Sequence, residues 1–342
     1  MMLRRNLVRL GKSSLVISLP KKWVERQNLK PGDEIVIFME EPNGLRIVPL
    51  SKVKGDKEEP LIINIDKISD EGLLETIIVG SYVVGKDPLI VKSEIGIKSN
   101  HFKAIRKVIN GIRGFEILHQ EPKKLIIKSI IDASKFSPPE LIDRMHSLLL
   151  SMVKYVERAL VNKNREYLDE VVYSEDELDR IFLTSLRMLA TTFRKADTCG
   201  KRESILNLAL YHEVIEVLEM SADLLEELAK KIKMVFDDLV QKEFERKLLT
   251  NMLQEIRDNL SRAIQALMNQ DITLANKAIA TYMILRERYL GLEDKLSMST
   301  KDVIMNVVLR DVVSRLLHIL KLVKLIASLS IFRSVGNRKE IP

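Results

Sequence analysis

The sequence has little of what several protein classes require. It holds one cysteine, Cys199, among 342 residues, which excludes an internal disulfide and a cysteine-rich zinc site. The most apolar stretch, residues 307–332, carries charged side chains at helical spacing, so no membrane insertion is expected. The N-terminus also lacks the apolar core of a signal peptide. We therefore expect a cytoplasmic protein.

Aromatic residues are also scarce, at 5%, whereas Leu, Ile, Val, Met, Lys and Glu dominate, a balance typical of helices. The length suffices for two or three domains. The sequence contains no glycine-rich phosphate loop and no arrangement of serine, histidine and acid that would support hydrolysis. These absences predict a protein that is not an enzyme.

Positive charge is concentrated at one end of the chain. Residues 3–30 carry eight basic side chains and one acidic side chain, so their surplus equals the formal net charge of the whole chain, +7. Clustered Lys and Arg release condensed counterions from nucleic acid, which makes this end the expected contact for a polyanion. The basic residues are Arg4, Arg5, Arg9, Lys12, Lys21, Lys22, Arg26 and Lys30.

The first 50 residues show short β patterns. Leu15, Ile17 and Leu19 alternate with other residues as in a half-buried strand, and Pro20 suits the first turn of a short helix. A Pro-Gly turn at residues 30–33 and a hairpin then follow, with strands at 34–39 and 45–50 around a turn at 42–44. A module this small buries too little apolar surface alone, so we expect it to form a homodimer.

This succession resembles a SpoVT/AbrB (MazE-like) domain. The resemblance rests on a basic first strand, Leu10-Gly11-Lys12, the strand at 15–19, Pro20 and Lys30-Pro31-Gly32-Asp33-Glu34. It implies an interlocked dimeric swapped-hairpin β-barrel that binds double-stranded DNA through its first strand and short helix. Val24 and Glu25 stand where many relatives have an arginine pair. The implied DNA contacts here are Arg4, Arg5, Arg9, Lys12, Lys21, Lys22 and Arg26.

Residues 61–131 alternate strand and helix patterns, which predicts a small α/β sheet with helices on one face. A spacer or dimerisation role is favoured there over a ligand pocket. From residue 137 onward the apolar period is 3.6, and the pattern repeats at an offset of 107 residues, giving two units of three helices. The predicted fold is multidomain α+β, with domains at 1–52 (AbrB-like), 60–133 (α/β) and 137–335 (six-helix bundle).

Two acidic pairs stand out in the first helical unit, Glu175 with Asp179 and Glu219 with Asp223. Residues four apart share one helix face, so the pairs could converge if their helices pack side by side. Gathered carboxylates suit iron, manganese, magnesium or, less well, zinc. The alternative is that both pairs are solvated faces of charge-rich helices.

The helical half also resembles the PhoU family of phosphate-uptake regulators. The resemblance rests on the tandem repeat and on the motifs Glu175-x-x-x-Asp179 and Glu219-x-x-x-Asp223, and it implies a bound metal cluster. In the second repeat the counterparts are Tyr282, Arg286, Ser314 and His318. Because these offer no carboxylate, we expect at most one metal site per chain, in the first repeat.

The two resemblances together make the chain similar to archaeal PhoU-type regulators with an N-terminal AbrB-like domain. They imply a transcriptional regulator of phosphate uptake, with a basic dimeric head on DNA and a bundle that senses metal or a partner protein. The alternative is an adaptor that contacts the ATPase of a phosphate transporter, or another phosphate-signalling protein, and does not bind DNA.

Overall fold

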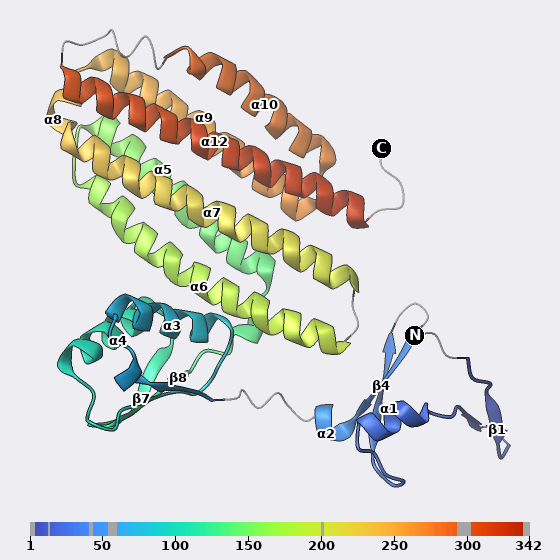
Figure 1. The fold of residues 1–342 in the computed structure, drawn as a ribbon. Helices are drawn as coiled ribbons and strands as arrows, with labels where there is room; N and C mark the ends of the chain where they lie inside the picture. Colours follow the sequence, from blue (N-terminus) through green and yellow to red (C-terminus); the bar gives the residue numbers. More distant parts are fainter. Residues whose placement is uncertain are drawn as a thin grey trace. The chain divides into compact units, whose positions relative to one another are not determined.

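The computed structural model describes residues 4–12, 14–40, 44–53, 60–199, 202–292 and 302–337. The chain forms two compact units, residues 1–57 and 58–342. The predicted multidomain α+β class is confirmed, with small strands first, a four-stranded sheet next and a helical bundle last (Figure 1). Within the described residues, no helix combines the length and apolarity needed to cross a membrane.

The first unit contains two separate antiparallel hairpins and a short helix. Their boundaries agree with the predicted strands to within a few residues, although residues 42 and 43 of the predicted turn at 42–44 lie outside the described residues. The Lys30–Asp33 turn forms as predicted, because Gly32 adopts a φ of 97° and the Asp33 carboxylate accepts the Lys30 backbone N–H at 2.7 Å. The elements are β1 (Val8–Leu10), β2 (Ser14–Val16), α1 (Lys21–Arg26), β3 (Ile35–Glu40), β4 (Gly44–Pro49) and α2 (Leu50–Val53).

This unit has almost no core of its own. Among its described residues, Pro49 alone is fully buried. Large apolar side chains from both hairpins are instead more than half exposed, and Met39 reaches 88%. An apolar surface left open in this way is typical of a face that another chain covers. The exposed apolar residues include Leu7, Val8, Leu10, Leu15, Ile37, Met39 and Leu45.

The second unit begins with a four-stranded sheet of order β5-β6-β8-β7. The pair β5–β6 is parallel and the other two pairs are antiparallel. Helices α3 and α4 pack together between the sheet and the bundle, as the predicted single covered face requires (Figure 1). The elements are β5 (Leu61–Asn64), α3 (Glu71–Val83), β6 (Leu89–Lys92), α4 (Ser99–Gly111), β7 (Phe115–Glu121) and β8 (Lys124–Ser129).

The bundle consists of long helices whose apolar faces share one core. Helix α5 begins at a capping-box sequence, in which the backbone N–H and the hydroxyl of Ser137 both donate to the Glu140 carboxylate. Helices α5, α6 and α7 form the first repeat, and α9, α10 and α12 form the second. The bounds are α5 (Pro138–Asn162), α6 (Tyr167–Cys199), α7 (Arg202–Met234), α8 (Phe236–Leu239), α9 (Glu243–Asn269), α10 (Ile272–Leu290) and α12 (Val303–Asn337).

The internal repeat is also present in the backbone. Helix α5 is followed by Lys163 and helix α9 by Gln270, and both of these residues adopt the left-handed conformation, with φ of 54° and 52°. Few residues other than glycine adopt this conformation, and it ends a helix abruptly. Its occurrence at two positions 107 residues apart agrees with the offset of the repeat in the sequence.

Candidate functional site

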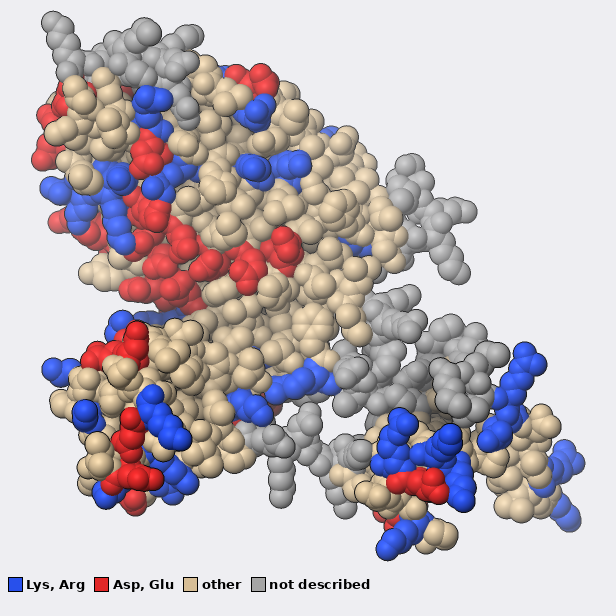
Figure 2. Space-filling view, in the orientation of Figure 1, with Lys and Arg blue, Asp and Glu red and all other residues tan. Residues whose placement is uncertain are grey.

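The seven predicted DNA contacts all lie at the surface of the first unit. Arg4, Arg5 and Arg9 are exposed on and before β1, and Lys12 is exposed in the turn after it. Figure 2 shows Lys and Arg gathered over β1 and over α1. Solvent-exposed cations on two neighbouring elements give this unit the electrostatic surface that a polyanion requires.

Helix α1 contributes three of these cations and one acid. Lys21, Lys22 and Arg26 are exposed on it, and Glu25 lies 3.8 Å from the Lys21 ammonium group. Both partners of this pair are solvent-exposed, so the pair contributes little and can open for another anion. Within the described residues, the other six predicted DNA contacts have no acidic partner. Their charge is therefore available to a ligand.

In the bundle, helices α6 and α7 pack side by side and bring their acidic motifs together. One carboxylate oxygen each from Glu175, Asp179 and Asp223 lies within 4.8 Å of the other two. Glu175 and Asp179 are partly buried, whereas Asp223 is exposed. Figure 2 shows acidic side chains gathered over these two helices. The structure therefore brings three of the four predicted ligands into one cluster.

The fourth predicted ligand, Glu219, lies outside this group but within its electrostatic field. Burial raises the pKa of Glu219 to about 7, and the charges of Asp223 and Asp179 act in the same direction. Glu219 is partly buried on the same face of α7, one turn before Asp223.

The carboxylates of the cluster destabilise one another as anions. Burial raises the pKa of Glu175 to about 8, with further contributions from Asp179, Glu226 and Asp223. Burial also raises the pKa of Asp179 and of Asp223, and neighbouring acids add to both shifts. Either a proton or a cation relieves this repulsion. The donor set thus fits a cation that prefers oxygen ligands, such as iron, manganese or magnesium.

The second repeat has no comparable acidic group among the residues that the structure describes. At the corresponding faces of α10 and α12, the side chains are Tyr282, Arg286, Ser314 and His318, and all four line one cavity. The two repeats therefore have side chains of different charge at corresponding places.

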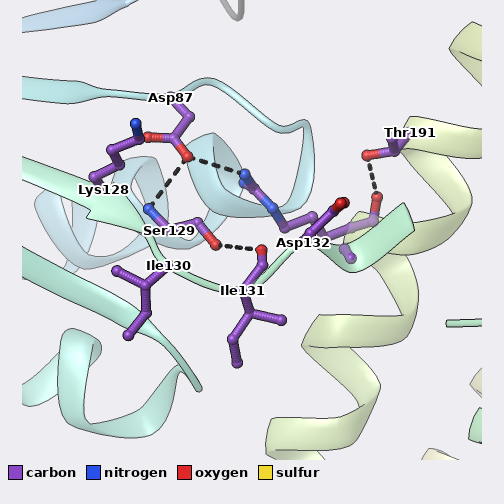
Figure 3. Close-up of a pocket in the computed structure, with 9 residues that line it drawn as sticks. Asp87, Lys128, Ser129, Ile130, Ile131, Asp132 and Thr191 are labelled. Carbon is purple, nitrogen blue, oxygen red and sulfur yellow. Dashed lines mark hydrogen bonds and ion pairs between the residues drawn. The ribbon is translucent and has the colours of Figure 1, made fainter. Parts of the chain in front are cut away.

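A second cavity, of about 240 Å³, lies where strand β8 meets helix α6 (Figure 3). Its central contact is a buried ion pair in which the Arg187 guanidinium lies 3.3 Å from Asp87. Arg187 also donates to the Tyr82 carbonyl at 2.7 Å, and Asp87 accepts the Ser129 backbone N–H at 3.2 Å. These contacts fasten the sheet to the first helical repeat.

The ion pair between Arg187 and Asp87 was not predicted from the sequence. Arg187 lies in an apolar stretch of α6, between Leu186 and Met188, and a buried arginine requires a partner. That signal predicts a buried acid but does not identify Asp87, which is 100 residues away. The same carboxylate also accepts the backbone N–H of Ser129, the last residue of β8.

Two family models match the chain. Residues 8–55 match the model for antidote-toxin recognition MazE, a bacterial antitoxin, and residues 142–232 match the PhoU domain. The predicted recognition of an AbrB/MazE-like head and a PhoU-like bundle is thereby confirmed. No match was found among curated proteins or among solved structures.

The chain thus contains two separate segments that match the models of regulatory families. The MazE match spans the first unit, and the PhoU match spans α5 to α7, which contain the acidic cluster. The PhoU match ends before α9. Both families are regulatory rather than catalytic.

Proposed function

We propose that the protein is a DNA-binding transcriptional regulator of phosphate uptake, in which the first unit binds duplex DNA and the bundle senses metal or a partner. The observation that carries this proposal is the exposed, largely unpaired basic surface on the segment that matches MazE. Counterion release from DNA by these cations supplies a large, sequence-independent part of the affinity.

The head functions as a homodimer. Its two hairpins leave apolar side chains such as Leu15 and Leu45 more than half exposed, and a second copy presents the same apolar face and unpaired strand edges. Covering them supplies the core that one chain lacks. A dimer also doubles the number of cations that meet the DNA.

If the head forms a dimer, light scattering at micromolar concentration should give the mass of two chains. Leu15→Asp would place a charge within the shared core and shift the mass towards one chain. Ser18→Asp, at an exposed polar position of the same segment, is the matched control and should remain dimeric. A single-chain mass for the unaltered protein would refute the dimer.

Glu175, Asp179 and Asp223 would hold a divalent or ferric ion, with Glu219 as a further ligand. Such an ion would neutralise their mutual repulsion and brace α6 against α7. Because the ligands come from two helices, loss of the ion changes how firmly those helices are held together. This gives the bundle a means of responding to metal availability.

Measuring the binding of duplex DNA at a series of salt concentrations distinguishes the proposed regulator from the alternative, an adaptor that does not bind DNA. For the regulator, the logarithm of the affinity of the full chain falls linearly with the logarithm of salt concentration, by about 0.9 for each neutralised phosphate. An adaptor that acts through protein contact alone would show no saturable binding at any salt concentration.

A further inference from the structure

The second repeat contains a basic cavity that neither family match assigns. It lies between α10 and α12 and has a volume of about 350 Å³, within the range of roughly 300–1,000 Å³ typical of small-ligand sites. Arg286 and Lys321 provide two permanent positive charges, and no carboxylate lines it. The complete lining is Tyr282, Arg286, Leu290, Ser314, Leu317, His318 and Lys321.

The polar side chains of this cavity are all able to donate hydrogen bonds. The Arg286 guanidinium offers a planar fork of N–H groups, which matches two oxygens of a tetrahedral oxyanion. Lys321 adds a compact charge. The hydroxyls of Ser314 and Tyr282 and a ring N–H of His318 complete a donor set that comes from both helices.

The cations that line this cavity have few acidic partners within the protein. Two other cations on these helices have acids beside them: Arg288 lies 2.5 Å from Glu255, and Arg315 lies 3.2 Å from Asp311. Lys321 and His318 have no acidic partner among the described residues. In the described part of the chain, Arg286 pairs only with the adjacent Glu287, at 2.9 Å, and both side chains are solvent-exposed. An anion with two charges can therefore displace that contact.

The cavity lies at the place in the second repeat that corresponds to the acidic cluster of the first repeat. Tyr282 and Arg286 occupy the positions on α10 that Glu175 and Asp179 occupy on α6, and Ser314 and His318 take the corresponding places on α12. The four acidic side chains of the first repeat are thus replaced by four hydrogen-bond donors in the second repeat. A cation is repelled here, whereas an oxyanion is attracted.

We propose that this cavity binds a phosphate-type oxyanion, either free inorganic phosphate or the phosphoryl group of a phosphomonoester. This inference goes beyond the proposed function, since it assigns a second ligand to the bundle and does not depend on DNA binding. Leu290 and Leu317 form the apolar part of the wall, which strengthens charge–oxyanion contacts by excluding water.

The test is calorimetric titration of the chelator-treated full chain with inorganic phosphate and, separately, with glycerol phosphate, at constant ionic strength. We expect one saturable site, weakened roughly 10-fold or more for each cation removed in Arg286→Ala and Lys321→Ala. Lys277→Ala removes an exposed charge from another face of α10 and should leave binding unchanged.

The two ligands distinguish the sources of the oxyanion. Binding of inorganic phosphate assigns the cavity to the free ion, and binding of glycerol phosphate alone assigns it to a phosphomonoester. Absence of binding by both, or equal losses in Lys277→Ala and Arg286→Ala, would overturn the proposal. Circular dichroism of each variant checks that the bundle remains folded, and Arg286→Lys tests whether the fork or the charge alone is needed.

Discussion

Replacing Arg4, Arg5, Arg9 and Lys12 with alanine is expected to weaken duplex DNA binding on the order of 100-fold or more at moderate salt. These four side chains lie exposed on and around β1, and in a dimer their removal eliminates twice that number of phosphate contacts. The slope of log affinity against log salt should flatten by about 0.9 for each phosphate that is no longer neutralised. Fluorescence anisotropy with a labelled duplex measures both quantities.

A matched control distinguishes local contact from general loss of charge. Alanine at Lys67, Lys103, Arg106 and Lys123 removes the same number of exposed cations from the second unit and should leave the slope unchanged. Equal weakening by both sets would mean that the head is not the DNA contact. Because the head residues touch no core, circular dichroism should show an intact bundle in both variants.

Changing Asp179 and Asp223 to asparagine together is expected to abolish metal binding by the bundle. The two residues contribute oxygens from different helices, and the cluster of three lies within 4.8 Å, so their loss leaves too few anionic ligands for a hard cation. Mass spectrometry should find metal bound to the first repeat of the unaltered chain and none in the variant. Asp176→Asn, exposed on the same helix, should retain the metal.

The metal affinity should also depend on pH. Because the pKa of Glu175 is raised to about 8, an incoming ion competes with a proton at neutral pH. Affinity should therefore rise as the pH increases from about 6 to about 8 and then level off, and Glu175→Gln should remove part of this dependence. Absence of metal from the unaltered chain, or equal metal content in the double variant, would exclude the cluster as the site.

Much of this architecture follows from local patterns in the sequence. The 3.6-residue apolar period and the 107-residue offset predict the two helical repeats, because each helix must bury one face. The left-handed ends at Lys163 and Gln270 then give that repeat a structural counterpart. The convergence of Glu175, Asp179 and Asp223 was also foreseeable, since both motifs have the same spacing and lie on adjacent helices.

Long-range pairing was not foreseeable from local patterns. The contact between Arg187 and Asp87 joins residues 100 positions apart, and only the packing of the α/β region against α6 brings them together. Similarly, the substitutions at Tyr282, Arg286, Ser314 and His318 predict loss of a metal site, but not that these residues and Lys321 line one cavity. That depends on how α10 and α12 approach each other.

The most direct test of the proposed regulatory role is genome-wide recovery of DNA bound to the protein in cells grown with ample and with scarce phosphate. The proposed function predicts discrete binding sites near phosphate-uptake genes whose occupancy differs between the two conditions, and loss of these sites in the Arg4, Arg5, Arg9 and Lys12 variant. Recovery of no DNA above background in either condition would contradict it.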